Sequence, residues 1–290
     1  MSAEKVFVIG GTGFVGAKAV NDLLDNKIPV TLFARNPDKV ASLFSNDLVN
    51  VIQGDFKDLS PIKDGIKGHT RLFLLVSDFY DFVNIKKTIA TYAYEAGIKQ
   101  IVDISSLVVN LGWRSTSIGS IHYYAEKAIY DIPNRGHFVT LRPGRFMSNH
   151  LGMMSPLANK GLYDNGAPNS PQGWISTNDI GAVAAVVLRE DVNKHSDAVY
   201  SLIGDVVTSN ERAAVLARIT GHDIKYTQIS QVQKYHKLME SGHFPHVFAL
   251  DLVTDLDGHD DKISPVIEIL LGRKPETVEE FLTANKNNLN

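Results

Sequence analysis

The stretch VFVIGGTGFVG occupies residues 6–16 and decides the fold class of this chain. Its apolar run leads directly into glycines spaced three residues apart, and Val15, Ala19 and Leu23 then recur at helical spacing. Glycines permit a tight turn between strand and helix, and the free N–H groups at the helix start attract phosphate. The motif therefore predicts a turn that binds the diphosphate of a dinucleotide. Its expected cofactor-binding residues are Gly10, Gly11, Thr12, Gly13, Phe14 and Val15.

Short apolar runs alternate with amphipathic stretches through the first half of the chain. Between two of the runs, Phe82, Ile85 and Ile89 recur at helical spacing, and Gly97 follows where a glycine cap belongs. This alternation predicts an α/β fold, a Rossmann-type doubly wound parallel sheet that binds ligands beyond the carboxyl ends of its strands. The expected strands are Val6 to Ile9, Val30 to Phe33, Val51 to Gln53, Leu72 to Val76, Ile101 to Ile104 and Phe138 to Leu141.

The second half of the chain has a different pattern. Loops that contain Gly and Pro appear around residues 161–173, and Thr277 with Glu280 has the capping-box spacing that begins a helix. We therefore expect a Rossmann domain over residues 1–149. Residues 150–290 are expected to form a smaller, mainly helical region on the substrate side, with some segments returning to the sheet.

The composition argues against several classes of protein. The chain has no cysteine, which excludes disulfides, thiolate catalysis and Cys-ligated zinc. A net charge of −3 without a Lys/Arg block argues against binding to nucleic acid. The start of the chain has no signal-like or membrane-spanning apolar run, so we expect a cytoplasmic protein with no membrane contact. The acidic run Asp255 to Asp261 lacks the spacing of a calcium loop, and no metal is expected.

The end of the second strand distinguishes between the two nicotinamide dinucleotides. An NAD enzyme normally places a carboxylate there, but this chain has Ala34, followed by Arg35 and then Lys39. Two cations at that point would bind a 2′-phosphate, which predicts NADP(H) as cofactor. Asp55 is placed either to meet the adenine edge or to form a plain turn. Further residues expected beside the cofactor are Asp55, Phe56, Val76, Ser77 and Lys127.

These motifs together resemble the NmrA-like branch of the atypical short-chain dehydrogenases over nearly the whole chain. The resemblance implies a Rossmann domain that binds NADP(H), a C-terminal part that closes a cleft over the nicotinamide, and Ser105 beside the cofactor. The matching residues are the glycine turn, Ala34 to Lys39, Gly54 to Phe56, Ser105-Ser106, His122 to Lys127, Leu141 to Asn149 and Gly272 to Leu282.

Two residue pairs compete for the catalytic position. Tyr123 and Lys127 form the only Tyr-x-x-x-Lys in the chain, and with Ser106 they match the catalytic group of short-chain dehydrogenases. His122 and Glu126 have the same i, i+4 spacing and match the arrangement of dye-reducing members of the branch. The two pairs point about 100° apart on a helix, so both cannot face the nicotinamide equally well. The sequence leaves both pairs as candidates.

Two functions are consistent with these residues. The first is an NADPH-dependent oxidoreductase that transfers hydride to a small planar unsaturated or carbonyl acceptor, such as a quinone, dye or aldehyde. Its pocket walls are expected to include Phe79, Tyr80, Phe146, Met147 and segments beyond residue 150. The second is a non-catalytic NADP(H) sensor that acts through a regulatory protein partner. A homodimer is compatible with either function.

Overall fold

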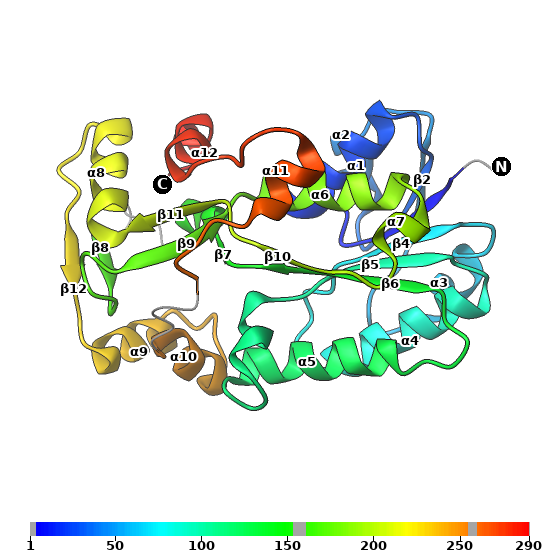
Figure 1. The fold of residues 1–290 in the computed structure, drawn as a ribbon, viewed down its shortest axis with the longest axis horizontal. Coiled ribbons are helices and arrows are strands. Elements are labelled where there is room, and N and C mark those ends of the chain that lie inside the picture. Colours follow the sequence, from blue (N-terminus) through cyan, green and yellow to red (C-terminus); the bar gives the residue numbers. More distant parts are fainter. Residues whose placement is uncertain (1–3, 153–160, 255–259, 290) are drawn as a thin grey trace.

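The centre of the computed structural model is a seven-stranded parallel sheet with the order β10-β6-β5-β4-β1-β2-β3 (Figure 1). The structure describes residues 4–152, 161–254 and 260–289, so most of the acidic run that begins at Asp255 lies outside it. The order reverses beside β1, and this reversal is where open α/β sheets bind ligands. The strands are β1 Val6–Ile9, β2 Val30–Ala34, β3 Val49–Gln53, β4 Arg71–Leu74, β5 Gln100–Ile104, β6 His137–Pro143 and β10 Val199–Leu202.

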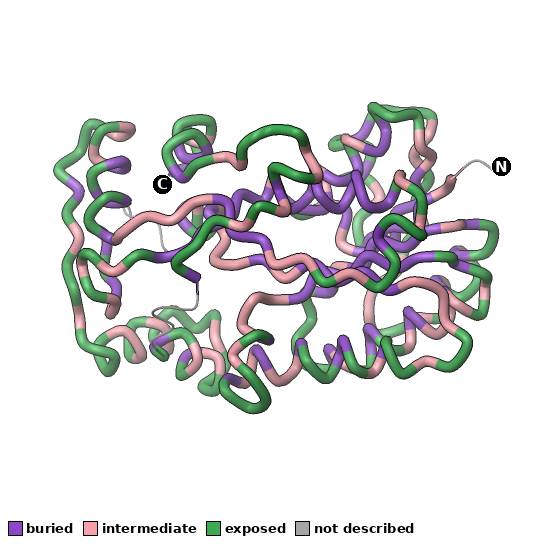
Figure 2. The backbone as a smooth tube through the Cα atoms, viewed as in Figure 1, coloured by how far each residue is buried: buried purple, intermediate pink, exposed green. Residues whose placement is uncertain are grey.

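Helices cover both faces of this sheet, as the alternating sequence pattern predicted. The inner strands are buried along their whole length because apolar side chains on both of their faces pack under helices (Figure 2). The helices of one face are α1 Phe14–Asp25, α2 Pro37–Leu43, α6 Thr177–Arg189 and α11 Pro265–Leu271. The helices of the other face are α3 Ser60–Gly65, α4 Phe82–Glu95 and α5 Ser117–Tyr130.

Segments from the second half of the chain complete the main sheet and one of its helical layers. Strand β10 pairs in parallel with β6, and α6 packs directly against α1. The two helices approach closely at Gly181, where an added Cβ would lie 2.6 Å from the Val15 carbonyl oxygen and 2.7 Å from the Lys18 Cβ. The main core therefore draws on both halves of the sequence.

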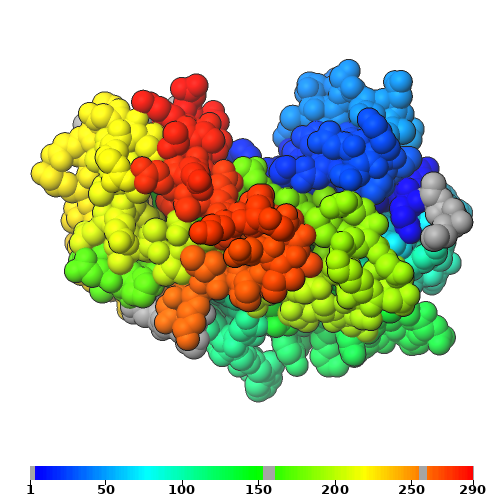
Figure 3. Space-filling view, turned by 45° about the horizontal axis from the view of Figure 1, so that its top comes forward, coloured from blue at the N-terminus to red at the C-terminus, as the bar shows by residue number. Residues whose placement is uncertain are grey.

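A smaller region forms around a third apolar core that contains Trp174 and Phe281. Figure 3 shows a notch between the C-terminal residues of the chain (red) and its N-terminal residues (blue). Thr277 and Glu280 form the predicted capping box. The elements of this region are β7 Arg145–Phe146, η2 Met147–Leu151, β8 Leu162–Asp164, β9 Pro171–Ile175, β11 Asp205–Thr208, α8 Ser209–Thr220, β12 Tyr226–Gln228, α12 Val278–Ala284 and η3 Lys286–Asn288. The other elements lie outside this core: η1 Leu107–Leu111 packs against α5, α7 Val192–His195 packs against α6, and α9 Gln231–Glu240 packs against α10 His246–Val253. Among the described residues, no helix is long and apolar enough to cross a membrane.

The contact between α1 and α6 gives a first prediction. We expect Gly181→Val to lower the free energy of unfolding by about 1–3 kcal/mol, because the new side chain meets a backbone carbonyl that cannot move aside cheaply. Arg189→Val, at the exposed end of the same helix, should change it by less than about 0.5 kcal/mol. Urea unfolding would measure both variants, and equal stability of the two would contradict the packing described above.

Candidate cofactor and substrate site

The glycine turn between β1 and α1 leaves its N–H groups available to a ligand. Gly10 has a φ of +81°, and an added Cβ there would lie 2.5 Å from the Leu75 carbonyl oxygen. A Cβ on Gly16 would collide with the Gly10 carbonyl oxygen, so α1 begins directly against the end of β1. Gly13 is the N-cap of α1, and no side chain caps the helix. This uncapped helix start fits a diphosphate, because the diphosphate supplies negative charge and hydrogen-bond acceptors to the unpaired N–H groups of the helix.

The ends of β2 and β3 carry the residues predicted to bind the adenosine side. Arg35 and Lys39 are both exposed, and the Asn36 side chain caps α2 by accepting from the Lys39 N–H at 3.1 Å. The Phe33 and Phe56 rings lie 6.4 Å apart. Asp55 accepts a hydrogen bond from the Lys57 N–H at 2.8 Å, which is a turn interaction. Two exposed cations beside the end of β2 fit a ribose phosphate.

A polar network ties the carboxyl ends of β5 and β6 to α5. The Glu126 carboxylate accepts from the Ser105 hydroxyl at 2.5 Å and from Arg142 Nε at 3.0 Å, and Arg142 Nη2 forms a second contact with it. Arg142 Nη1 also donates to Asn110 Oδ1 at 2.7 Å, and Asn110 donates to the Ser201 hydroxyl at 3.3 Å. The network therefore fixes the turn after β5 and the η1 segment that follows it.

The structure separates the two candidate catalytic pairs. His122 and Glu126 are buried on the inner face of α5. Tyr123 is 38% exposed, and Lys127 forms an exposed ion pair with Asp131 at 2.5 Å. Tyr123 and Lys127 are therefore not brought to the inner face that holds Glu126, and their catalytic role stays a prediction.

His122 lies in an apolar setting. Its ring packs edge-on against Phe82 and Phe79, at 4.7 Å and 6.4 Å between centroids. Burial, reinforced by the nearby Lys86 ammonium, lowers the pKa of His122 well below its usual value. Its Nδ1 has no hydrogen-bond partner among the described residues. The imidazole is therefore neutral at physiological pH.

A fully buried ion pair under β5 was not predicted from the sequence. Lys86 Nζ lies 2.7 Å from Asp103 Oδ1 and donates to the Ile104 carbonyl oxygen at 2.9 Å. Burial raises the pKa of Asp103 to about 6, against the opposing effect of Lys86. The available signal was a lysine on the apolar face of α4, one turn after Phe82, together with an acid inside an apolar strand. The pair supports the backbone that leads into Ser105.

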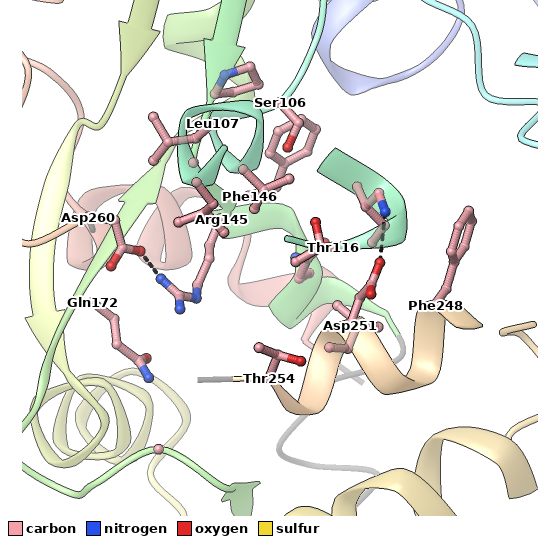
Figure 4. A pocket seen from close by; sticks show the side chains of 18 of the residues that line it. Ser106, Leu107, Thr116, Arg145, Phe146, Gln172, Phe248, Asp251, Thr254 and Asp260 are labelled. Carbon is pink, nitrogen blue, oxygen red and sulfur yellow. Dashed lines mark hydrogen bonds and ion pairs between the residues drawn. The ribbon is translucent and has the colours of Figure 1, made fainter. Parts of the chain in front are cut away.

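A cavity of about 520 Å³ opens beyond the carboxyl ends of β5 and β6. Figure 4 shows Ser106, Leu107 and Phe146 on one side of it and α10, with Phe248 and Asp251, on another. Its lining is mostly apolar, and its volume suits a small organic molecule. Of the predicted catalytic residues, Ser106 lines this cavity. Further walls come from β8, β9 and α10, in the part of the chain beyond residue 150 that was expected to contribute to the pocket, although no local motif there marked the individual residues.

The other predicted site residues take different positions. Phe79 and Phe146 line the cavity, whereas Tyr80 is fully exposed and Met147 is buried in the third core. Val76 is buried at the end of β4, with the exposed Ser77 beside it. Phe14 is exposed next to the glycine turn, while Val15 is buried under α6.

The parallel sheet, its order and the uncapped glycine turn define a Rossmann-type α/β protein. The chain belongs to the NmrA-like family, whose model matches residues 2–282. This match confirms the resemblance inferred from the motifs.

Individual relatives match over nearly their whole length. NAD(P)H azoreductase of Xenophilus azovorans is 25% identical over 287 residues, which is 97% of each chain. The NADPH-dependent quinone oxidoreductase of Escherichia coli, solved with NADPH, has a TM-score of 0.81 and 23% identity over 97% of this chain and 100% of its own. Citrobacter sp. triphenylmethane reductase complexed with NADP(H) has a TM-score of 0.78 and 21% identity over 96% of this chain and 99% of its own. The two structural matches show the shared fold.

The buried Lys86–Asp103 pair gives a prediction with a defined pH dependence. We expect Lys86→Met to lower the free energy of unfolding by about 3–5 kcal/mol at neutral pH, because it leaves a buried carboxylate unpaired. The folded-state pKa of Asp103 is already raised to about 6, so protonation favours folding, and this contribution is lost as the pH rises through that value. The variant should raise the pKa further, so its loss should be smaller near pH 5 than near pH 8.

The control for this variant is Lys87→Met, which removes an exposed lysine from the neighbouring position of α4 and should have little effect. Urea unfolding at both pH values would measure the difference. A loss for Lys86→Met that is larger in acid than in base would contradict the role of Asp103.

Proposed function

We propose that this protein is an NADPH-dependent reductase that delivers a hydride to a small planar unsaturated or carbonyl acceptor. The observation that carries the proposal is the apolar cavity at the carboxyl ends of β5 and β6, in the same sheet as the uncapped glycine turn. The NAD(P)H azoreductase and NADPH quinone oxidoreductase relatives support the same reaction class.

The cofactor side of the proposal rests on the chain's own groups. The N–H groups at the start of α1 bind the diphosphate, and Arg35 with Lys39 binds the 2′-phosphate. When bound, the reduced nicotinamide supplies the hydride. Gly10 and Gly16 keep the turn tight, because a Cβ at either position would collide with a backbone carbonyl oxygen.

The substrate side rests on Ser106 and the apolar walls. Ser106 precedes η1, and its side chain forms no cap hydrogen bond with that helix. The hydroxyl can therefore donate to an acceptor oxygen or nitrogen on which negative charge develops. Phe79, Phe146 and Phe248 exclude water around a planar ring. Glu126 and Arg142 neutralise each other and position the backbone around Ser106.

NADPH consumption tests this proposal directly. The purified protein should oxidise NADPH in the presence of at least one member of a panel of quinones, azo or triphenylmethane dyes, and aldehydes. Parallel titrations with NADP⁺ and NADPH measure cofactor binding. Tight binding that differs between the two redox forms, without turnover of any acceptor, would favour the sensor function instead.

Arg35 gives a prediction about cofactor choice. We expect Arg35→Asp to weaken NADPH binding by about 10- to 100-fold, because a charge-assisted contact with the 2′-phosphate is lost. NADH binding should change much less. The control is Arg189→Asp, since Arg189 contacts Asn26 at the C-terminal end of α1, away from the glycine turn, and should affect neither cofactor. Equal losses for NADPH and NADH would remove Arg35 from the phosphate role.

Ser106 and Tyr123 give a prediction about the hydride step. At saturating NADPH, Ser106→Ala should lower kcat/KM by at least about tenfold, because it removes a donor to the developing charge. Tyr123→Phe should have a much smaller effect, since the phenol lies on the outer face of α5. Stopped-flow measurement of NADPH oxidation compares the two variants. A loss confined to Tyr123→Phe would restore Tyr123 and Lys127 as the catalytic pair.

A further inference from the structure

One wall of the cavity carries polar groups that the proposed hydride step does not use. We name this the donor wall and define it as Gln172, Trp174 and Lys234, which come from β9 and α9 and all line the cavity. Figure 4 shows Gln172 on the side opposite Ser106. The donor wall is therefore a separate part of the same binding space.

The hydrogen-bond acceptors of this wall are already occupied, while donors remain. Arg212, fully buried behind the wall, donates from Nη2 to Gln172 Oε1 at 3.0 Å and lies over the Trp174 ring at 4.5 Å. This contact orients the Gln172 amide, and its Nε2 has no acceptor among the described residues. Trp174 is 1% exposed, and its Nε1 also lacks a partner within the described chain. A ligand in the cavity that offers acceptor oxygens would pair with the Gln172 Nε2 group.

The charges around the wall favour the same kind of ligand. Lys234 Nζ lies 2.7 Å from Asp164 Oδ1 and donates to Asn165 Oδ1 at 2.8 Å, which uses two of its three protons. Arg212 Nη2 lies 4.0 Å from Asp164 Oδ2. Lys234, Arg212 and Asp164 therefore carry an excess of one positive charge among themselves. In the same lining Arg145 pairs with Asp260, and the Asp251 carboxylate accepts from the Ile118 N–H on the α10 side of the cavity.

Protonation at neutral pH does not remove this excess. Burial lowers the pKa of Arg212 only to about 10, so the guanidinium stays charged. Burial opposes ionisation of Asp164, but Lys234, the Asn165 N–H and Arg212 together outweigh it and lower the pKa of that carboxyl. The neighbouring His150, whose pKa burial lowers to about 3, is neutral.

We propose that the donor wall binds an anionic oxygen group, such as a carboxylate or sulfonate, carried by an aromatic ligand of the cavity. Charge-assisted hydrogen bonds from the Lys234 ammonium and the Gln172 amide would hold such a group. A ligand without it leaves buried donors unpaired, which is how polar sites reject analogues. The inference rests on the proposed function. It predicts that aromatic hydride acceptors with an acidic group are the preferred substrates of the reductase.

A matched pair of fluorescent probes tests the binding step without turnover. Anilinonaphthalene sulfonate and phenylnaphthylamine differ by one sulfonate, and both can be titrated against the full chain in the presence of NADP⁺. We expect the sulfonate probe to bind at least about tenfold more tightly to the wild-type protein. Lys234→Gln and Gln172→Leu should each remove most of this preference and leave the neutral probe unchanged, whereas Lys234→Arg should retain it.

The control variant is Lys237→Gln on the same helix, because Lys237 lies over the Tyr163 ring and is not part of the cavity lining. It should leave both probes unaffected. Equal affinity of the wild-type protein for the two probes would overturn the inference, and so would an equal effect of Lys234→Gln on both. Sulfonate preference without NADPH turnover would uphold the donor wall and reject the proposed reductase, and the two failures are therefore distinguishable.

Discussion

The close approach of α1 to the end of β1 is the constraint on which the other layers depend. It exists because Gly16 has no side chain to meet the Gly10 carbonyl oxygen. Helix α1 in turn packs on α6 at Gly181, where the Val15 carbonyl oxygen takes the space of a side chain. Helix α6 starts directly after β9, the strand that carries Trp174 into the cavity lining. The glycine turn and one wall of the cavity are thus held by the same series of backbone contacts.

The start of α6 also explains the C-terminal motif that carries the family resemblance. Asp179, fully buried on α6, accepts from Arg273 at 2.7 Å and from the Glu276 N–H at 2.7 Å. Glu276 in turn accepts from the side chains of Ser176 and Asn178. Each acid or amide in this group has a specific partner, so the segment before α12 can attach in one register only. The motif is therefore structural, and it holds the C-terminal helix against the region that contains β9.

Much of the fold follows from the sequence because its signals are local. The glycine turn, the apolar strands and the capping box at Thr277 depend on residues within a few positions of one another, and the structure has them where they were predicted. The sequence predicted only in general terms that later segments return to the sheet. It did not identify β10, because Val199–Leu202 is short and only two of its residues are aliphatic. The predictable part of the site was the part built from these local motifs.

The rest of the site depends on contacts between distant residues. The phase of α5 could not be read from residues 122–127, because His122 and Tyr123 are adjacent and each has a partner four positions later. The structure buries His122 through Phe79 and Phe82, which lie 40 or more positions earlier in the chain. Lys86 with Asp103 and Arg212 with Gln172 are also partners that lie apart in the sequence. These pairs can be recognised only when the arrangement of the strands and helices is known. Buried polar partners separated in this way leave no periodic pattern in the sequence.

The electrostatics of the two ends of the cavity differ, and the difference gives a bound molecule a direction. Near Ser106 the charges are paired, because Glu126 faces Arg142, Lys86 faces Asp103 and the adjacent imidazole is neutral. Around Gln172 and Lys234 the described groups have an excess of positive charge. A planar acceptor with an acid at one end would lower its electrostatic energy by placing that end against Lys234. Its uncharged, reducible end would then lie toward the carboxyl ends of the strands, where the proposed hydride transfer takes place.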